Sequence, residues 1–441
     1  MNPRLEAFDV LRRVEAARAF AGILLEEREG RFADPRDAAL LHELVLGVLR
    51  RRAALDHAIA RVSSRPLGEV DLEVLIALRL GAYALLHLDR VPDFAAVTTS
   101  VDLVRAAGRK AAAGFANGVL RQIARRGAAL LPPEPARGDA DALALYASHP
   151  AWWTRRLVQR VGWDRARAIV EADNLPAATV LRVRHGIDPR LDGIESRPGT
   201  FAPGALHVVS GRPTATPGFA AGTFWMQDEG SQLVPALAGV GAGARVLDAC
   251  AAPGGKTLAL ADAVGETGFV VAADRHAGRL RRLARNVARC RLGNVAAVAA
   301  DMTAPPLRAG FDVVLVDAPC SGTGTMRRHP EIRWRLRLED LPAIAERQQR
   351  LLAAAAGLVR PGGAIVYAVC SMEPEEGASV VETFLASHPA FRRADARPFL
   401  PEPARALVGE EGYLHTSPDL DGMDGFFAAR IESIADRRVA P

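Results

Sequence analysis

Residues 244–257 read ARVLDACAAPGGKT, an apolar run that ends in an acid and opens into a glycine-rich turn. A short apolar run bounded by turn residues predicts a buried strand. Glycine lets a backbone come close to a ligand, and a helix that starts there presents its N-terminal amides to that ligand. The stretch therefore predicts a strand–turn–helix unit with a ligand site at the turn.

The same pattern repeats from here to the end of the chain. Helical stretches at 276–289 and 342–358 separate further apolar runs, which are GFVVAAD (268–274), AAVAAD (296–301), FDVVLVD (311–317), AIVYAVC (364–370) and GFFAARI (425–431). This alternation predicts an α/β fold, a mostly parallel, doubly wound sheet with helices on both faces. Ligands of such sheets bind beyond the carboxyl ends of the strands. Distinctive residues end these strands, and we expect them at one edge: Asp248, Asp274, Asp301, Asp317 and Cys370.

The first part of the chain has a different pattern. Apolar residues recur at helical spacing from residue 1 to about 130, as at Leu41, Leu44 and Val48, which predicts an all-α unit. The Pro- and Gly-rich stretch LPPEPARGDADA (131–142) is typical of a linker, and a small α+β segment follows it. We expect three domains, at 1–135, 143–235 and 236–435.

Composition limits the function without deciding it. The 441 residues are 49% hydrophobic and 24% charged, as in globular proteins, and the net charge of +5 permits an RNA partner without requiring one. The N-terminus lacks the apolar core of a secretory signal, and no apolar stretch reaches the ~18 residues of a membrane span. We therefore expect no membrane partner and a cytoplasmic location.

The four cysteines are far apart and form no CxxC pair. The spacing predicts neither a metal site nor a disulfide framework, and free thiols fit a reducing compartment. Burial as ordinary structural residues is the simplest interpretation for Cys250 and Cys290.

The glycine-rich turn matches neither of two common nucleotide motifs. A phosphate-binding P-loop needs glycine at the position of Cys250, and the GxGxxG fingerprint is absent. A nucleoside ligand without a pyrophosphate fits better, with Asp274 suited to ribose hydroxyls. A plain tight turn remains an alternative.

Two cysteines at the ends of neighbouring strands are the sharper signal. Cys320 lies in Pro-Cys-Ser-Gly and Cys370 in Cys-Ser. Cysteine is intrinsically nucleophilic and forms some thiolate near neutral pH. Thiolate addition at C6 of a cytosine turns the poorly nucleophilic C5 into a carbon that can accept a methyl group, so the pair favours this chemistry over two structural thiols.

Five long segments stand out in the last part of the chain: FWMQDEGSQL (224–233), DACAAPGGKT (248–257), VDAPCSGTGTMRRHPEIRW (316–334), YAVCSMEPEEG (367–377) and DGFFAARI (424–431). Together they resemble the RsmB/Nop2-type family of RNA cytosine-5 methyltransferases. The first part contains ELVLGVLRRR (43–52), LRLGAYALLHLDRVP (78–92) and GFANGVLRQI (114–123), and it is similar to the NusB-like domain of the RsmB branch. The resemblance implies a Rossmann-like class I methyltransferase domain behind an RNA-binding domain.

The resemblance also implies the roles of individual residues. S-adenosylmethionine would be held at its methionine end by the turn, which comprises Cys250, Ala251, Ala252, Pro253, Gly254, Gly255 and Lys256. Asp274 would bind its ribose and Asp301 its adenine, with help from Arg279. Cys370 would be the nucleophile, Cys320 would assist product release, and Asp317 would border the cofactor and hydrogen-bond the cytosine. The substrate would be 16S ribosomal RNA, and we expect a monomer.

Two positions depart from the family's pattern. Val369 precedes the expected nucleophile where the family has threonine, and Val97-Thr98-Thr99 stands where Asn and Glu are expected after the valine. A basic and aromatic stretch after the Pro-Cys motif is expected either to grip RNA or to form an ordinary solvated surface. Its members are Arg327, Arg328, His329, Arg333, Trp334, Arg335 and Arg337.

Two other functions stay open at this point. A DNA cytosine-5 methyltransferase would use the Pro-Cys cysteine as nucleophile with a Glu-Asn-Val motif, which this sequence lacks. A NusB-like RNA-binding factor with a non-catalytic methyltransferase domain would not need the intact Cys320, Cys370 and Asp317.

Overall fold

The computed structural model describes residues 2–17, 19–420 and 422–434, and it divides into two compact units. The helical unit comprises residues 1–176 and 326–338, and the sheet unit comprises residues 177–325 and 339–441. The three-domain division stays a prediction, and the predicted end at 435 lies outside the described residues. None of the described helices is long and apolar enough to cross a membrane.

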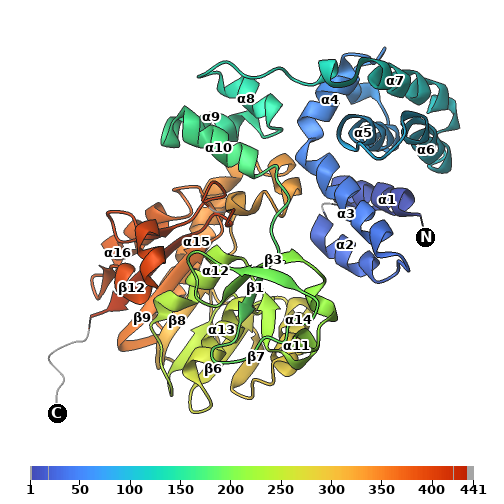
Figure 1. The fold of residues 1–441 in the computed structure, drawn as a ribbon. Helices are drawn as coiled ribbons and strands as arrows, with labels where there is room; N and C mark the ends of the chain where they lie inside the picture. The colour runs from blue at the N-terminus through green and yellow to red at the C-terminus, as the bar shows by residue number, and fades with distance from the viewer. Residues whose placement is uncertain (1, 18, 421, 435–441) are drawn as a thin grey trace, which may run out of the picture. The chain divides into compact units, whose positions relative to one another are not determined.

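The helical unit contains ten α-helices among its described residues (Figure 1). They are α1 (Pro3–Ala17), α2 (Ala21–Glu29), α3 (Pro35–Arg50), α4 (Arg52–Ala60), α5 (Leu72–His87), α6 (Asp93–Ala106), α7 (Ala113–Arg126), α8 (Ala140–Tyr146), α9 (Ala151–Val161) and α10 (Trp163–Ala172). Asp34 caps α3 by accepting a hydrogen bond from the Arg36 amide. The predicted apolar face of α3, with Leu41, Leu44 and Val48, is buried in the core. The expectation of an all-α N-terminal part is confirmed.

The sheet unit begins with a small antiparallel sheet in the order β2-β3-β1-β4. Its strands are β1 (Val180–Val183), β2 (Glu195–Pro198), β3 (Ala205–Ser210) and β4 (Phe224–Met226). Two short helices accompany them, α11 (Pro217–Ala221) and α12 (Glu229–Leu233). The buried Glu229 carboxylate joins the sheet to α12, because it accepts hydrogen bonds from the Phe201 and Ala202 amides and pairs with His207.

The large sheet has the order β10-β12-β9-β8-β5-β6-β7. Its strands are β5 (Arg245–Asp248), β6 (Phe269–Asp274), β7 (Val295–Ala299), β8 (Phe311–Asp317), β9 (Val359–Val369), β10 (Phe391–Ala394), β11 (Leu414–His415), which pairs only with β12, and β12 (Phe427–Ser433). The five strands from β5 to β9 pair in parallel, and β10 to β12 pair antiparallel. The predicted mostly parallel sheet is confirmed.

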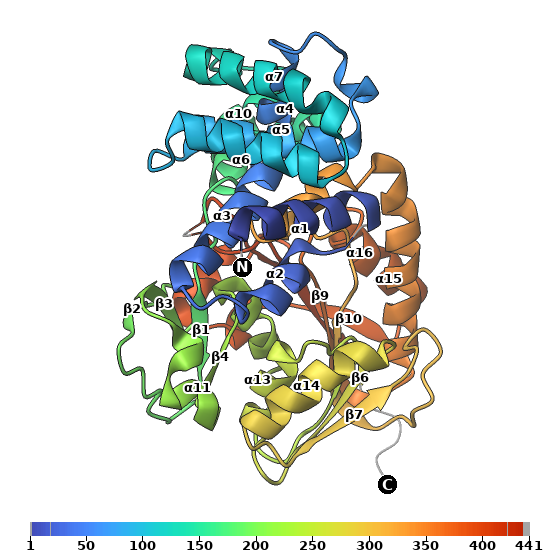
Figure 2. The ribbon, with the colours of Figure 1, turned by 90° about the vertical axis from the view of Figure 1, so that its right-hand side faces the viewer.

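Helices cover both faces of this sheet (Figure 2). They are α13 (Gly255–Val264), α14 (Ala277–Arg289), α15 (Leu341–Ala356) and α16 (Ala378–Ser387). Side chains alternate along a strand, so Val313 and Leu315 of β8 face α13 while Val314 and Val316 face α15 and α16. The sheet is thus buried on both sides, which leaves its carboxyl edge for a ligand.

Candidate active site

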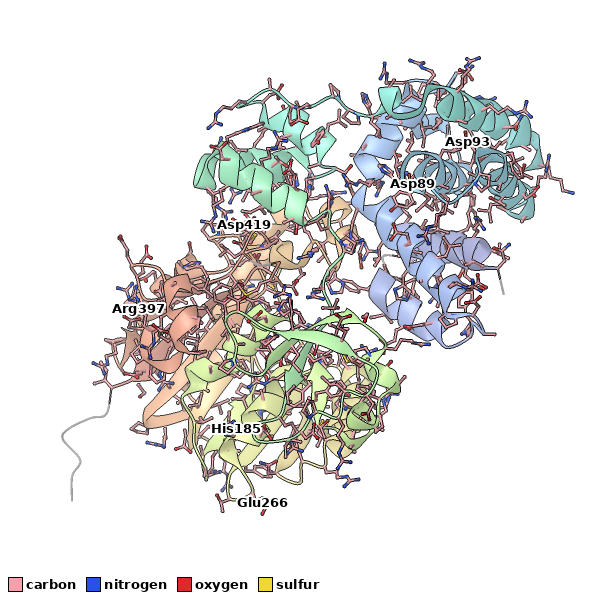
Figure 3. The ribbon with its side chains drawn as sticks, in the orientation of Figure 1. Asp89, Asp93, His185, Glu266, Arg397 and Asp419 are labelled. Carbon is pink, nitrogen blue, oxygen red and sulfur yellow. The ribbon has the colours of Figure 1, made fainter. Side chains whose placement is uncertain are left out.

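The carboxyl ends of β5, β8 and β9 lie next to one another. Asp248 pairs in register with Leu315 of β8, and Asp317 pairs with Ala368 of β9. The parallel registers therefore bring Asp248, Asp317 and Cys370 to one edge. Glu266 lies in the turn before β6 and marks the opposite edge (Figure 3).

The glycine-rich turn runs from the end of β5 into α13. Gly254 has φ +112°, in the left-handed region that favours glycine, and a Cβ there would lie 3.1 Å from Leu283 Cγ. α13 begins at Gly255, so its first amides lack intrahelical partners and face the turn. The turn therefore has a backbone that can approach a ligand at a helix N-terminus.

Two acidic residues continue this edge towards β6 and β7. Asp274 is buried and accepts hydrogen bonds from the Ala252 amide at 3.3 Å and the His276 amide at 2.9 Å, while Arg279 lies 3.5 Å away. Asp301 is exposed two residues beyond β7, and the Thr303 amide and hydroxyl donate to it. These hydrogen bonds, the amide first, lower the Asp301 pKa. Both side chains accept hydrogen bonds from backbone amides just after their strands, and Asp274 contacts the turn through the Ala252 amide.

Lys256 and Asp317 form an ion pair with 2.7 Å between Nζ and Oδ2. Burial would lower the Lys256 pKa, but the charge of Asp317 and its hydrogen bond outweigh that effect, so the pKa is raised. The Phe426 ring lies 5.1 Å from Nζ. The pair fixes Asp317 beside the turn.

Asp248 is buried beneath the turn. Burial raises the pKa of Asp248 to about 7. A hydrogen bond from the Thr257 hydroxyl at 2.7 Å opposes this rise, and the negative charge of Asp317 adds to it. Asp248 was expected only as a strand-ending residue, and its hydrogen bond with Thr257 ties the end of β5 to the first turn of α13.

The two thiols meet where β8 and β9 end. Cys320 Sγ and Cys370 Sγ are 3.3 Å apart, within hydrogen-bond distance for sulfur. The hydrogen bond with Cys370, and then burial, raises the Cys320 pKa well above its ordinary value. Cys320 is therefore a neutral thiol that can donate to the sulfur of Cys370. The sequence placed these cysteines on adjacent strands, and the structure brings their sulfurs into contact.

A buried carboxylate that the sequence analysis missed ties the two cysteine loops together. Glu376 is fully buried and accepts hydrogen bonds from the Ser321 amide at 2.8 Å, from the Ser321 and Ser371 hydroxyls and from Gln348 Nε2 at 3.1 Å. Ser321 follows Cys320 and Ser371 follows Cys370, so Glu376 fixes the residue next to each thiol. The sequence carries only the acidic run EPEE as a signal, and it does not show that Glu373 and Glu376 are buried while Glu375 is partly exposed.

The valine before Cys370 has a structural place. Val369 is the last residue of β9, is fully buried, and packs in the apolar cluster on the α15 and α16 face with Tyr367. The Val369 side chain thus points into the core on the α15 and α16 face of the sheet.

The basic stretch after the Pro-Cys motif lies in the helical unit, and the expectation that it grips RNA or is simply solvated is wrong for two of its members. Arg333 is 1% exposed and Arg327 is 8% exposed. Arg333 donates to Asn174 Oδ1 at 2.8 Å and to the Asp173 carbonyl at 2.8 Å, and Arg327 donates to the Pro176 carbonyl. Trp334 likewise donates to the Leu49 carbonyl at 2.9 Å. These side chains hold residues 326–338 inside the helical unit.

The remaining cysteines lie apart from the paired thiols. Cys290 is fully buried in a small cluster with Trp225 and Leu258, as expected of a structural thiol. Burial, followed by the charge of Asp248, raises the Cys250 pKa. In the part of the chain that the structure describes, no group of His, Cys, Asp and Glu could hold a metal ion.

Two family models match this chain. The model of 16S rRNA methyltransferase RsmB/F matches residues 237–432, and the NusB family model matches residues 1–125. The first covers the large sheet and its edge, and the second covers most of the helical unit.

Curated relatives match almost the full length. The "Probable ribosomal RNA small subunit methyltransferase B" of Bacillus subtilis is 33% identical over 96% of this chain and 96% of its own length. The ribosomal RNA small subunit methyltransferase B of Pseudomonas putida is 34% identical over 99% of this chain and 100% of its own. A solved methyltransferase homologue from Pyrococcus horikoshii covers 68% of this chain and 100% of its own at 27% identity, with a TM-score of 0.58.

Proposed function

Because this chain belongs to the 16S rRNA methyltransferase RsmB/F family, we propose that it transfers a methyl group from S-adenosylmethionine to carbon 5 of a cytosine in small-subunit ribosomal RNA. The relatives' names support the ribosomal substrate. The choice of cytosine C5 rests on the paired thiols. A location in the cytoplasm follows from such a substrate.

The observation that carries the proposal is the 3.3 Å separation of Cys320 Sγ and Cys370 Sγ at the sheet edge. Addition to a pyrimidine needs one nucleophilic sulfur, and a second group beside it can assist the later steps. A structural pair of thiols would not need to lie beside Asp317 and the glycine-rich turn.

Cys370 is the nucleophile in this proposal. Its thiolate forms a bond to C6 of cytosine, and the electron pair displaced from the C5–C6 double bond makes C5 nucleophilic. C5 then gains the methyl group, and the donor would leave as S-adenosylhomocysteine. The C5 proton leaves to water, and the C5–H electron pair restores the C5–C6 double bond as the bond between C6 and sulfur breaks and Cys370 departs as a thiolate. Cys320, held neutral by its raised pKa, stabilises that thiolate by donating a hydrogen bond.

Asp317 orients the base. Its Oδ2 is held by Lys256 at 2.7 Å, and the carboxylate retains further acceptor positions for the amino group of cytosine. The carboxylate also borders the turn, so the same group can face both the cytosine and the methyl donor.

The turn and its acids fit S-adenosylmethionine. Its methionine end would lie against residues Cys250–Lys256, where Gly254 leaves the backbone open and the first amides of α13 attract a carboxylate. Asp274 would accept the ribose hydroxyls, and Asp301, exposed beyond β7, would border the adenine, with Arg279 anchored to the turn by the Ala252 carbonyl at 2.7 Å. When bound, S-adenosylmethionine supplies an electrophilic methyl group.

A methylation assay with two substrates tests the proposal. The purified chain is incubated with isotope-labelled S-adenosylmethionine and either a 16S rRNA transcript or DNA of the same sequence, and the products are digested to nucleosides. We expect label in 5-methylcytidine from the RNA alone. Label in DNA would favour the DNA enzyme, and RNA binding without any label would favour a non-catalytic binding factor.

A further inference from the structure

A strongly basic segment runs along the sheet unit from the proposed cofactor site. Residues 275–300 contain seven arginines and no aspartate or glutamate. The whole chain is nearly balanced, with 56 Lys and Arg against 51 Asp and Glu, so this imbalance is local. Most of it lies on α14, whose first turn has no acidic residue.

The arginines of α14 divide into inward and outward groups. Leu280 and Leu283 are buried against the sheet, and Arg289 is also turned inward, where it donates to the Phe219 carbonyl at 2.7 Å. Arg281 and Arg285 are exposed and lie one helical turn apart on the opposite side. In the described part of the chain, neither forms an ion pair with an acidic side chain. Like charges at this spacing repel, so a bound polyanion would relieve a repulsion that the fold leaves in place.

This outward face begins at the site. α14 follows Asp274, and Arg279 at its start donates to the Ala252 carbonyl of the glycine-rich turn at 2.7 Å. Arg275, between Asp274 and the helix, is also exposed. In Figure 2, α14 lies in front of β6 and β7 and is seen from its side.

We propose that Arg281 and Arg285 on the outward face of α14 bind the phosphate backbone of the RNA strand that enters the active site. Arginine binds phosphate through its planar fork of donors, and two of them one turn apart can contact neighbouring phosphates. The contacts are to the backbone, so they position the RNA and carry no sequence information. The inference rests on the proposed function, because it needs an RNA substrate.

The test replaces both side chains with glutamine, a good helix former, as Arg281→Gln/Arg285→Gln. The matched control is Arg308→Gln/Arg392→Gln, which removes the same charge from two exposed positions off α14. RNA affinity is measured with a 16S rRNA transcript from 50 to 200 mM KCl, alongside S-adenosylmethionine affinity and thermal unfolding. We expect the α14 variant to bind RNA at least about tenfold more weakly at 100 mM salt, with a salt slope smaller by about 1.4–1.8. Its cofactor affinity and unfolding temperature should equal those of the control.

Three other results would each overturn the inference, and they can be told apart. RNA affinity and salt slope equal to those of the control, in a wild-type protein that methylates rRNA, would overturn the inference and leave the proposed function standing. A wild-type protein that neither binds nor methylates rRNA would overturn the proposed function and this inference with it. Loss of binding to vesicles of anionic phospholipid, without loss of RNA binding, would assign the face to a membrane surface and overturn the proposal.

Discussion

Replacing Glu376 with alanine should destabilise the sheet unit and disable the pair of thiols. The carboxylate accepts hydrogen bonds from the Ser321 amide, the Ser321 and Ser371 hydroxyls and Gln348 Nε2, all in a buried setting. A buried donor left without an acceptor costs about 1–3 kcal/mol. Four donors at the lower end of that range give a loss of roughly 4 kcal/mol in the free energy of unfolding.

The assay is thermal unfolding of the variant without ligand. For a unit of 150–250 residues, a loss of roughly 4 kcal/mol lowers Tm by about 8–16 °C. The control is Glu346→Ala on α15, whose side chain is 68% exposed and which should change stability by no more than about 0.5 kcal/mol. Glu376→Gln keeps the shape of the side chain and should recover most of the stability, while methyl transfer stays below wild type because one carboxylate acceptor becomes a donor.

The result that would refute this reasoning is a Tm for Glu376→Ala within about 2 °C of both wild type and Glu346→Ala, since that shift is under about 1 kcal/mol. Normal methyl transfer by Glu376→Ala would separately show that the two cysteine loops keep their geometry without it.

Three further predictions concern the cofactor, the helical unit and pH. Asp274→Ala should weaken S-adenosylmethionine binding at least about tenfold, because each lost hydrogen bond to an ionised group costs about 1.5–3 kcal/mol; unchanged affinity in a binding titration would place the ribose elsewhere. Deleting residues 1–144 should spare cofactor affinity but lower RNA turnover, since it removes the Leu49 carbonyl that accepts from Trp334; full turnover at ordinary RNA concentration would contradict this. The Asp248 pKa is raised to about 7, so the folded protein binds that proton more tightly than the unfolded chain, and stability should fall from pH 4 to pH 7 and stay low above it. Asp248→Asn should weaken that fall, as measured by urea unfolding at pH 4 and pH 8, and an unchanged pH dependence would assign it to other groups.

The arrangement of the sheet could be predicted because its strands are short apolar runs between helices. Most of these runs end in a polar residue at the carboxyl end of a strand, so Asp248, Asp274, Asp317 and Cys370 could be assigned to one edge from spacing alone. The parallel pairing of β8 with β9 then followed from the alternation of strands and helices. The functional roles of these residues stay predictions.

The features that could not be predicted from the sequence depend on contacts between residues far apart in the chain. Arg333 is charged and would normally be solvated, but backbone carbonyls of Arg50 and Asp173 accept its hydrogen bonds and allow its burial. Glu376 is buried for the same reason, through donors 28 and 55 residues away. Sequence shows the charge of such residues, but their burial depends on which distant donors and acceptors the fold supplies.

The central claim is that Cys370 attacks the base and Cys320 assists its release, and one denaturing gel tests it directly. Cys320→Ala and Cys370→Ala are each incubated with 16S rRNA and S-adenosylmethionine and denatured without nuclease. In Cys320→Ala, Cys370 should still attack C6 of the cytosine, and C5 should still accept the methyl group. The reaction should then stall before the bond between sulfur and C6 breaks. Cys320→Ala should therefore give a slowly migrating protein–RNA band, and Cys370→Ala should give none. A band from Cys370→Ala and none from Cys320→Ala would make Cys320 the nucleophile and contradict the assignment.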